Sequence, residues 1–138
     1  MSCICDVHKE FISKCGYSDL VHWCSDPNNV YVGRKGILII NSRRYPEKDS
    51  TWANPYKVDS DNKKKDGTLT EVLYKYWYHL EKMLNENPSL IEELKSLRSK
   101  RLGCWCVKQP YIDANDPNTW VCHAQILAYF ANVKYREF

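Results

Sequence analysis

One stretch decides the fold: residues 101–127 read RLGCWCVKQPYIDANDPNTWVCHAQIL. Its first part, RLGCWCV, is typical of a strand, and its last part, CHAQIL, is typical of the beginning of an amphipathic helix. In a strand, Cys104 and Cys106 point to one face of the sheet and Trp105 to the other. The stretch therefore predicts a strand, a loop and a helix, with thiols gathered near the junction.

The elements on either side indicate the fold class. We expect strands over residues 29–34 and 37–41, and the second, ILIIN, reads as a strand buried on both faces. Apolar residues at helical spacing predict helices over 69–84 and 90–97, with Thr68 or Asp66 capping the first. Thr119 or Asn118 would cap the last helix. This order favours an α/β fold, a small Rossmann-like three-layer domain with a mostly parallel sheet.

The N-terminal residues 1–28 are predicted to form a Cys/His-rich extension with two short helices, over residues 6–14 and 18–24. Residues 29–138 would form the α/β domain. The extension holds six metal-binding side chains without a C-x-x-C pair, so buried or surface thiols are favoured over a metal site. These side chains are Cys3, Cys5, His8, Cys15, His22 and Cys24.

Composition narrows the class of protein. The chain has 138 residues, 43% of them hydrophobic, and a net charge of +3, which fits one globular domain with a mildly basic surface. A nucleic-acid partner is not favoured at this charge. It stays an alternative because of a set of basic residues: Lys63–Lys65, Arg43, Arg44, Arg98, Lys100 and Arg101. No apolar run is long enough to cross a bilayer, and the N-terminus lacks a signal-peptide stretch, so we expect no membrane partner and an intracellular protein.

The seven cysteines allow three interpretations. A reducing compartment disfavours a disulfide. Cys104, Cys106 and Cys122 could ligate a metal, and zinc is the ion that such donors select. The cofactor therefore stays unknown, with zinc as the candidate. His123 cannot easily share that ion, because adjacent helical residues diverge by about 100°. The third interpretation makes Cys122 a reactive thiol with His123 beside it, both catalytic.

A second group of polar residues follows the first predicted strands: Arg34, Trp52, Asn54 and Lys57. An arginine fork binds phosphate or carboxylate, and a tryptophan ring stacks on a ligand ring. We expect these four residues to bind a ligand at the carboxyl ends of the strands. The alternative is that Asn54 builds a tight turn and Trp52 fills the core.

Three segments together resemble an uncharacterised domain family of phages, large DNA viruses and bacteria, a domain of unknown function. They are NVYVGR, STWANPYKV and LGCWC followed by CHAQIL, and the resemblance covers about residues 29–130. It implies site positions at the residues named above, without a reaction, and a viral origin would place the protein in the cytoplasm of an infected cell. We expect a domain that binds a nucleotide-like or phosphorylated small ligand. A stronger form of this hypothesis is that the domain also processes the ligand. The alternatives are a zinc-stabilised interaction domain and a nucleic-acid-binding module.

Overall fold

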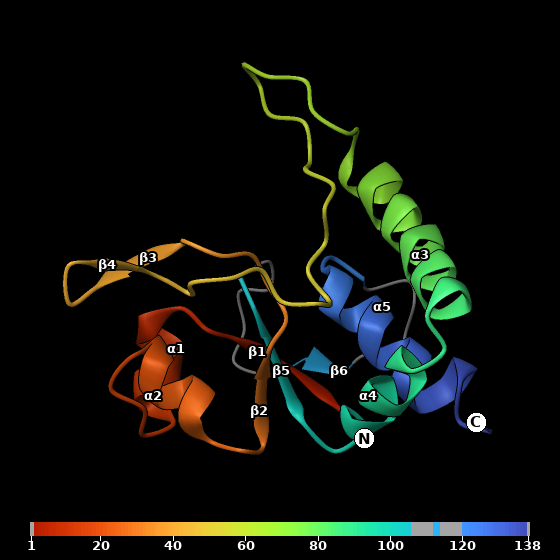
Figure 1. Cartoon of the computed structure of the whole chain (residues 1–138). Helices are drawn as coiled ribbons and strands as arrows, with labels where there is room; N and C mark the ends of the chain where they lie inside the picture. The colour runs from red at the N-terminus through yellow and green to blue at the C-terminus, as the bar shows by residue number, and fades with distance from the viewer. Residues whose placement is uncertain (1, 106–111, 114–119, 138) are drawn as a thin grey trace.

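The computed structural model describes residues 2–105, 112–113 and 120–137 (Figure 1). It is a mixed α/β fold built around a four-stranded sheet in the order β2-β5-β1-β6. The strands are β1 (Cys3–Asp6), β2 (Asn29–Tyr31), β5 (Arg101–Cys104) and β6 (Ile112–Asp113). The first three are parallel, and β6 runs antiparallel to β1. The predicted α/β class and mostly parallel sheet are therefore confirmed.

Helices pack against both faces of this sheet (Figure 1). On one face lie α3 (Leu69–Glu86), α4 (Leu90–Ser96) and α5 (His123–Tyr129), which continues as the π-helical segment η2 (Phe130–Lys134). On the other face lie α1 (Lys9–Lys14) and α2 (Leu20–Ser25). Each face of the sheet carries its own hydrophobic core. Ile4 and Leu102 point into the core beside α3–α5, whereas Cys5 points into the core beside α1 and α2, because successive side chains of a strand alternate between faces.

The long helix α3 follows directly from its sequence. Its buried face consists of Val72, Tyr76, Leu80 and Leu84, which recur every four residues. Thr68 begins the helix: its hydroxyl accepts from the backbone N–H of Glu71, and the Glu71 carboxylate accepts from that of Thr68. The predicted helix and its Thr68 cap are confirmed.

The N-terminal extension differs from its prediction as a purely helical element. Residues Cys3–Asp6 form β1, which lies between β5 and β6 in the main sheet. The parallel register places Asp6 beside Cys104, so the carboxyl ends of β1 and β5 meet at one edge. The two short helices α1 and α2 follow where the sequence predicts them, although α1 begins only at Lys9.

The aliphatic run ILIIN is not the predicted strand buried on both faces. Its residues Leu38–Ile40 form β3, which pairs only with β4 (Arg43–Tyr45) in a separate two-stranded sheet. One face of this hairpin is open to water, and Ile39 is 69% exposed. Its Leu38, Ile40 and Tyr45 pack on the core beside α1 and α2, and Figure 1 shows the hairpin lying above these helices. A separate arm, residues 57–67, extends away from the body of the molecule before α3.

The last helix also begins differently. Its N-cap is Cys122, and neither Thr119 nor Asn118, both outside the described residues, occupies that position. Within the described part of the chain, none of the helices combines the length and apolar character needed to span a membrane.

Candidate functional site

A cleft of about 490 Å³ opens at the carboxyl ends of β2 and β5. Segment 54–58 and the first turns of α3 form its walls, and the end of β5 with the start of α5 forms its floor. This is the position at which ligands bind in α/β sheets. Six of the predicted site residues line it: Arg34, Asn54, Lys57, Cys104, Cys122 and His123. Two do not appear there, because Trp52 belongs to the core and Cys106 lies outside the described residues.

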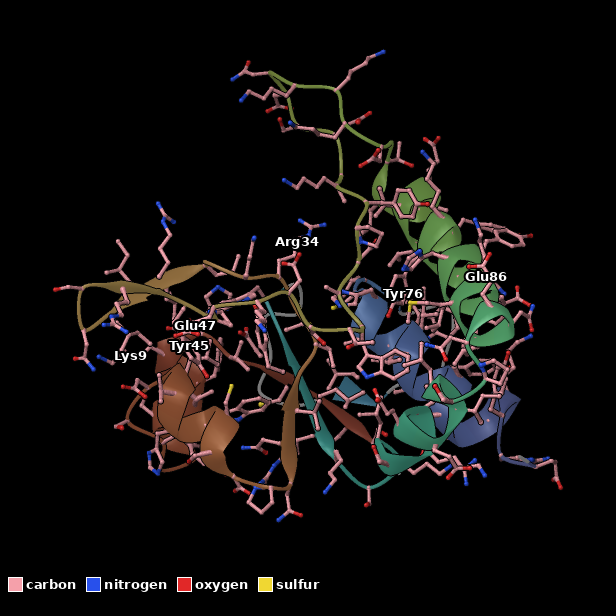
Figure 2. The ribbon with its side chains drawn as sticks, in the orientation of Figure 1. Lys9, Arg34, Tyr45, Glu47, Tyr76 and Glu86 are labelled. Carbon is pink, nitrogen blue, oxygen red and sulfur yellow. The ribbon has the colours of Figure 1, made fainter. Side chains whose placement is uncertain are left out.

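Arg34 builds the wall of the cleft as well as lining it. Its Nε donates to the carbonyl of Asn54 at 2.9 Å, and its Nη2 donates to the carbonyl of Tyr56 at 2.5 Å. Figure 2 shows the side chain of Arg34 projecting beyond the sheet toward this segment. The guanidinium therefore fixes segment 54–58 and leaves its positive charge at the rim, where an anionic ligand group would be stabilised.

Asn54 and Trp52 have the structural roles that the sequence offered as the alternative to ligand binding: Asn54 builds a tight turn, and Trp52 fills the core. The Asn54 side-chain oxygen accepts from the backbone N–H of Tyr56 at 2.9 Å, which is an Asx turn. Trp52 is only 5% exposed, and its carbonyl accepts from the Tyr76 hydroxyl at 2.7 Å. Lys57 carries an exposed side chain on the cleft wall, and its backbone N–H donates to Asp66 in the arm.

Cys122 and His123 form the floor, and the local sequence fixes both. Cys122 caps α5: its sulfur accepts from the backbone N–H of Ala124 at 3.4 Å, and Gln125 accepts from the Cys122 N–H at 3.0 Å. The His123 Nε2 lies 2.6 Å from the carbonyl of Val32. Because a carbonyl only accepts, Nε2 carries the proton, and Nδ1 is the acceptor of the neutral ring.

That acceptor faces the thiol. The distance from His123 Nδ1 to Cys122 Sγ is 3.7 Å, and both residues are buried. The ring of Tyr76, which projects from α3 (Figure 2), packs edge-on against His123 with 5.1 Å between ring centroids. Burial raises the pKa of the Tyr76 hydroxyl well above its usual value, so this neighbour stays neutral. The arrangement can transfer the thiol proton to the imidazole.

Cys104 completes the floor from the end of β5. Its sulfur lies 2.6 Å from that of Cys122, closer than the van der Waals contact of two sulfurs. Two thiolates on one tetrahedral zinc ion, each about 2.3 Å from the metal, stand roughly 3.8 Å apart. The pair as placed is therefore too close for that geometry. In residues 2–105, 112–113 and 120–137, no group of three His, Cys, Asp or Glu side chains is arranged to hold a metal.

The sequence assigned no ligand-binding role to two pairs of residues in or beside the cleft, although the family motif already includes Trp105. The first pair is aromatic. The rings of Tyr56 and Trp105 line the cleft. Trp105 Nε1 donates to the Tyr31 hydroxyl at 2.8 Å, and that hydroxyl donates to the Arg34 carbonyl at 2.7 Å. Burial raises the pKa of Tyr31 to about 12. A side chain at Gly33 would place its Cβ 2.5 Å from the Tyr31 oxygen, so glycine is required for this close approach.

The second pair comes from the N-terminal segment. His8 lines the cleft, and its Nδ1 is hydrogen-bonded to the fully buried carboxylate of Asp6 at the end of β1. The ring of His8 packs edge-on against Trp105 with 4.8 Å between centroids. The sequence signal was weak, since β1 is only four residues long and precedes the recognised motifs.

The basic residues considered for nucleic-acid binding are partly engaged elsewhere. Arg98 donates to the carbonyls of Ala131 and Tyr135, and Lys100 donates to that of Pro27. Arg101 forms an ion pair with Asp26. Because these three cations bind other parts of the chain, they are less available to bind the phosphates of a nucleic acid.

Comparison with known proteins places these residues within a family. Residues 18–133 match the family described as Domain of unknown function (DUF4326). "Uncharacterized protein R718" of Acanthamoeba polyphaga mimivirus is 29% identical over 89 residues, which are 64% of this chain and 55% of that protein. The chain thus spans little more than half the length of this relative. No solved structure matches. The matched range begins before the predicted domain boundary at residue 29 and excludes Asp6 and His8.

Proposed function

The chain belongs to the DUF4326 family of domains of unknown function, and on that premise we propose that it binds and processes a nucleotide-like or phosphorylated small ligand. Cys122 acts as the nucleophile and His123 as its base. One observation carries the proposal: the bond from His123 Nε2 to the Val32 carbonyl leaves Nδ1 facing the Cys122 sulfur. A thiol beside an oriented base at the floor of a cleft is what a cysteine nucleophile requires.

The cationic rim supports an anionic ligand. Arg34 and Lys57 both line the cleft, and the cleft also reaches the first turn of α3 at Leu69 and Val72. Two cations at one wall attract a phosphate or carboxylate from solution and hold it with charge-assisted hydrogen bonds. We assign the anionic group of the ligand to this wall.

The aromatic lining supports a ligand with a planar ring. We assign the stacking role to Tyr56 and Trp105, because the ring predicted for this role, Trp52, is packed in the core. Stacking of a base on an aromatic side chain contributes about 1–3 kcal/mol. A ring held here would place the rest of the ligand toward the sulfur of Cys122.

The proposed step is a nucleophilic displacement. The Cys122 sulfur attacks an electrophilic carbon of the ligand while His123 Nδ1 takes the thiol proton. A carbon–sulfur bond forms, the bond from that carbon to its leaving group breaks, and the proton passes from Nδ1 to the leaving group. The Rossmann-like three-layer assignment belongs to the same proposal, since helices on both faces and a cleft at the strand ends fit it.

Thermal-shift measurements with a panel of nucleotides, nucleosides and sugar phosphates test the binding. We expect at least one anionic compound to raise the melting temperature by a few degrees, as saturating ligands do. Lys57→Ala should weaken its affinity about tenfold, which is the loss of one charge-assisted hydrogen bond. Lys63→Ala, at the tip of the exposed arm, is the matched control and should leave binding unchanged. A panel without any shift, or equal affinity in Lys57→Ala, would overturn the proposal.

A further inference from the structure

We propose that Cys122 and Cys104 form a reversible oxidation site for hydroperoxides, in which Cys122 attacks the peroxide and Cys104 resolves the product as a disulfide. The inference rests on the proposed function in one respect, since it uses the same ionised Cys122 thiol. It adds a co-reactant class, a second reacting residue and a way to switch the site off.

The first support is the position of the two sulfurs. They lie 2.6 Å apart, although 18 positions separate the residues in sequence. Cys104 ends β5, and Cys122 is the N-cap of α5, so two rigid elements hold the pair. An S–S bond measures about 2.05 Å, so only a small displacement brings the sulfurs to bonding distance.

The second support is that their surroundings differ. The Cys122 sulfur accepts from the Ala124 N–H at 3.4 Å and lies 3.7 Å from His123 Nδ1. A backbone donor and an adjacent base both favour negative charge on this sulfur. Cys122 is therefore the attacking thiol. Cys104, at the end of the strand, is the second thiol within reach of the sulfenic acid that results.

The third support is that a small peroxide can reach the two sulfurs, whereas a large thiol cannot. Both cysteines line the cleft, yet each is only 1% exposed. Hydrogen peroxide is nearly as small as water and can enter a cleft of about 490 Å³. A large thiol such as a protein cysteine cannot approach so buried a sulfur, so the intramolecular partner reacts first.

The chemistry balances in two steps. The Cys122 thiolate attacks one peroxide oxygen, the O–O bond breaks, and the departing oxygen takes the proton held on His123 to leave as water or an alcohol. The Cys104 sulfur then attacks the sulfenic sulfur, an S–S bond forms, the S–O bond breaks, and water leaves with the Cys104 proton. Two thiols are oxidised by two electrons in total, and one hydroperoxide is reduced.

Oxidation has a direct consequence for the proposed function, because the disulfide removes the nucleophile. It also ties the end of β5 to the cap of α5. A dithiol reductant would restore both thiols by exchange. The cleft would then be active only under reducing conditions.

Intact-mass measurement and peptide mapping of the full chain test the site. Reduced protein is exposed to a slight excess of hydrogen peroxide, and the fragments are analysed without reduction. We expect loss of two hydrogen atoms and one link, Cys104 to Cys122, reversed by dithiothreitol. A link to Cys106, links among the N-terminal cysteines, or no link would each overturn the proposal.

Variants assign the roles. Cys104→Ser should accumulate a sulfenic acid at Cys122, trapped by dimedone at least ten times more than in the wild type. Cys122→Ser should leave Cys104 unoxidised. Cys106→Ser is the matched control and should form the same link as the wild type. Equal dimedone trapping in Cys104→Ser and the wild type would contradict Cys104 as the resolving residue, and the wild-type link is informative even where a variant fails to fold.

The two proposals fail separately. A Cys104–Cys122 link in a protein that no nucleotide stabilises supports the oxidation site and removes the proposed ligand. A nucleotide-stabilised protein without the link removes the oxidation site and retains the ligand.

Discussion

The cysteines on the two faces of the sheet have opposite surroundings. Near α1 and α2, burial raises the pKa of Cys3, Cys5 and Cys24, and Cys5 reaches about 12. Near α5, Cys122 lies against a second sulfur, a backbone donor and an imidazole. The first set has the surroundings of packing residues, and the second has the surroundings that the proposed chemistry requires. The contrast teaches that the number of thiols in a chain does not locate a site, whereas a base beside one thiol does.

The largest expected effect is a difference in alkylation rate between the two faces. With a pKa of about 12, roughly one Cys5 thiol in ten thousand is ionised at pH 8. Since the Cys122 thiol lies beside an imidazole and a backbone donor, we expect iodoacetamide to modify Cys122 much faster than Cys5. Peptide mass spectrometry over a time course measures both rates. Comparable rates would abolish the contrast.

A second prediction concerns the strand that separates the two faces. A Cβ at Gly103 would lie 2.4 Å from the Trp23 ring and 2.6 Å from Val7 Cγ1. Gly103→Ala should therefore destabilise the fold by about 2–3 kcal/mol through overpacking on the α1/α2 side. Urea denaturation measures it, and Ser99→Ala on the exposed surface is the control. An unchanged midpoint would mean that the α1/α2 side packs more loosely than described.

A third prediction concerns Tyr76, whose ring packs against His123. Tyr76→Phe removes the hydroxyl that donates to the buried Trp52 carbonyl, and about 1–2 kcal/mol of stability should be lost with it. Tyr74→Phe is the matched control, because Tyr74 lies on the exposed side of the same helix and is 64% exposed. Equal unfolding free energies for the two variants would show that the buried bond contributes nothing.

The last expected effect is a change in the alkaline limit of stability. Burial raises the pKa of Cys5 from 9.0 to about 12, so the folded state favours the protonated thiol. That stabilisation is present below pH 9 and is lost as the pH rises toward 12, because the unfolded chain then releases its proton first. Cys5→Ala should flatten this decline only partly, since Tyr31 and Tyr45, both with pKa values of about 12, still contribute. Urea midpoints from pH 8 to 11 measure it, and an unchanged slope would contradict the assignment to Cys5.

Local signals in the sequence predicted the regular elements well. The four-residue spacing of α3 and its Thr68 cap specify a helix without help from the rest of the chain. The strand β5 was also predictable from RLGC, as was its position before the final helix. Most of the candidate site followed, because the carboxyl ends of parallel strands and the next helix start converge in any such sheet.

The positions of β1, β3 and Trp52 could not be predicted from the sequence, because they depend on contacts between distant parts of the chain. Cys3–Asp6 is too short to show periodicity, so its place inside the sheet depends on pairing with β5 and β6. The sequence therefore did not predict that His8, held by Asp6, would line the cleft. The aliphatic ILIIN looked buried, yet it pairs with one neighbour only. Trp52 and Trp105 are equally plausible stacking rings in sequence, and only packing assigns the first to the core and the second to the cleft.

The most direct test of the central claim is the rate of Cys122 alkylation as a function of pH in the wild type and in His123→Asn. If His123 Nδ1 accepts the thiol proton, the variant should react at least ten times more slowly at pH 7, and the two rates should approach each other at high pH, where hydroxide removes the thiol proton without the imidazole. Circular dichroism and the melting temperature establish that the variant is folded. Equal rates at pH 7 in a folded variant would contradict the Cys122–His123 pair.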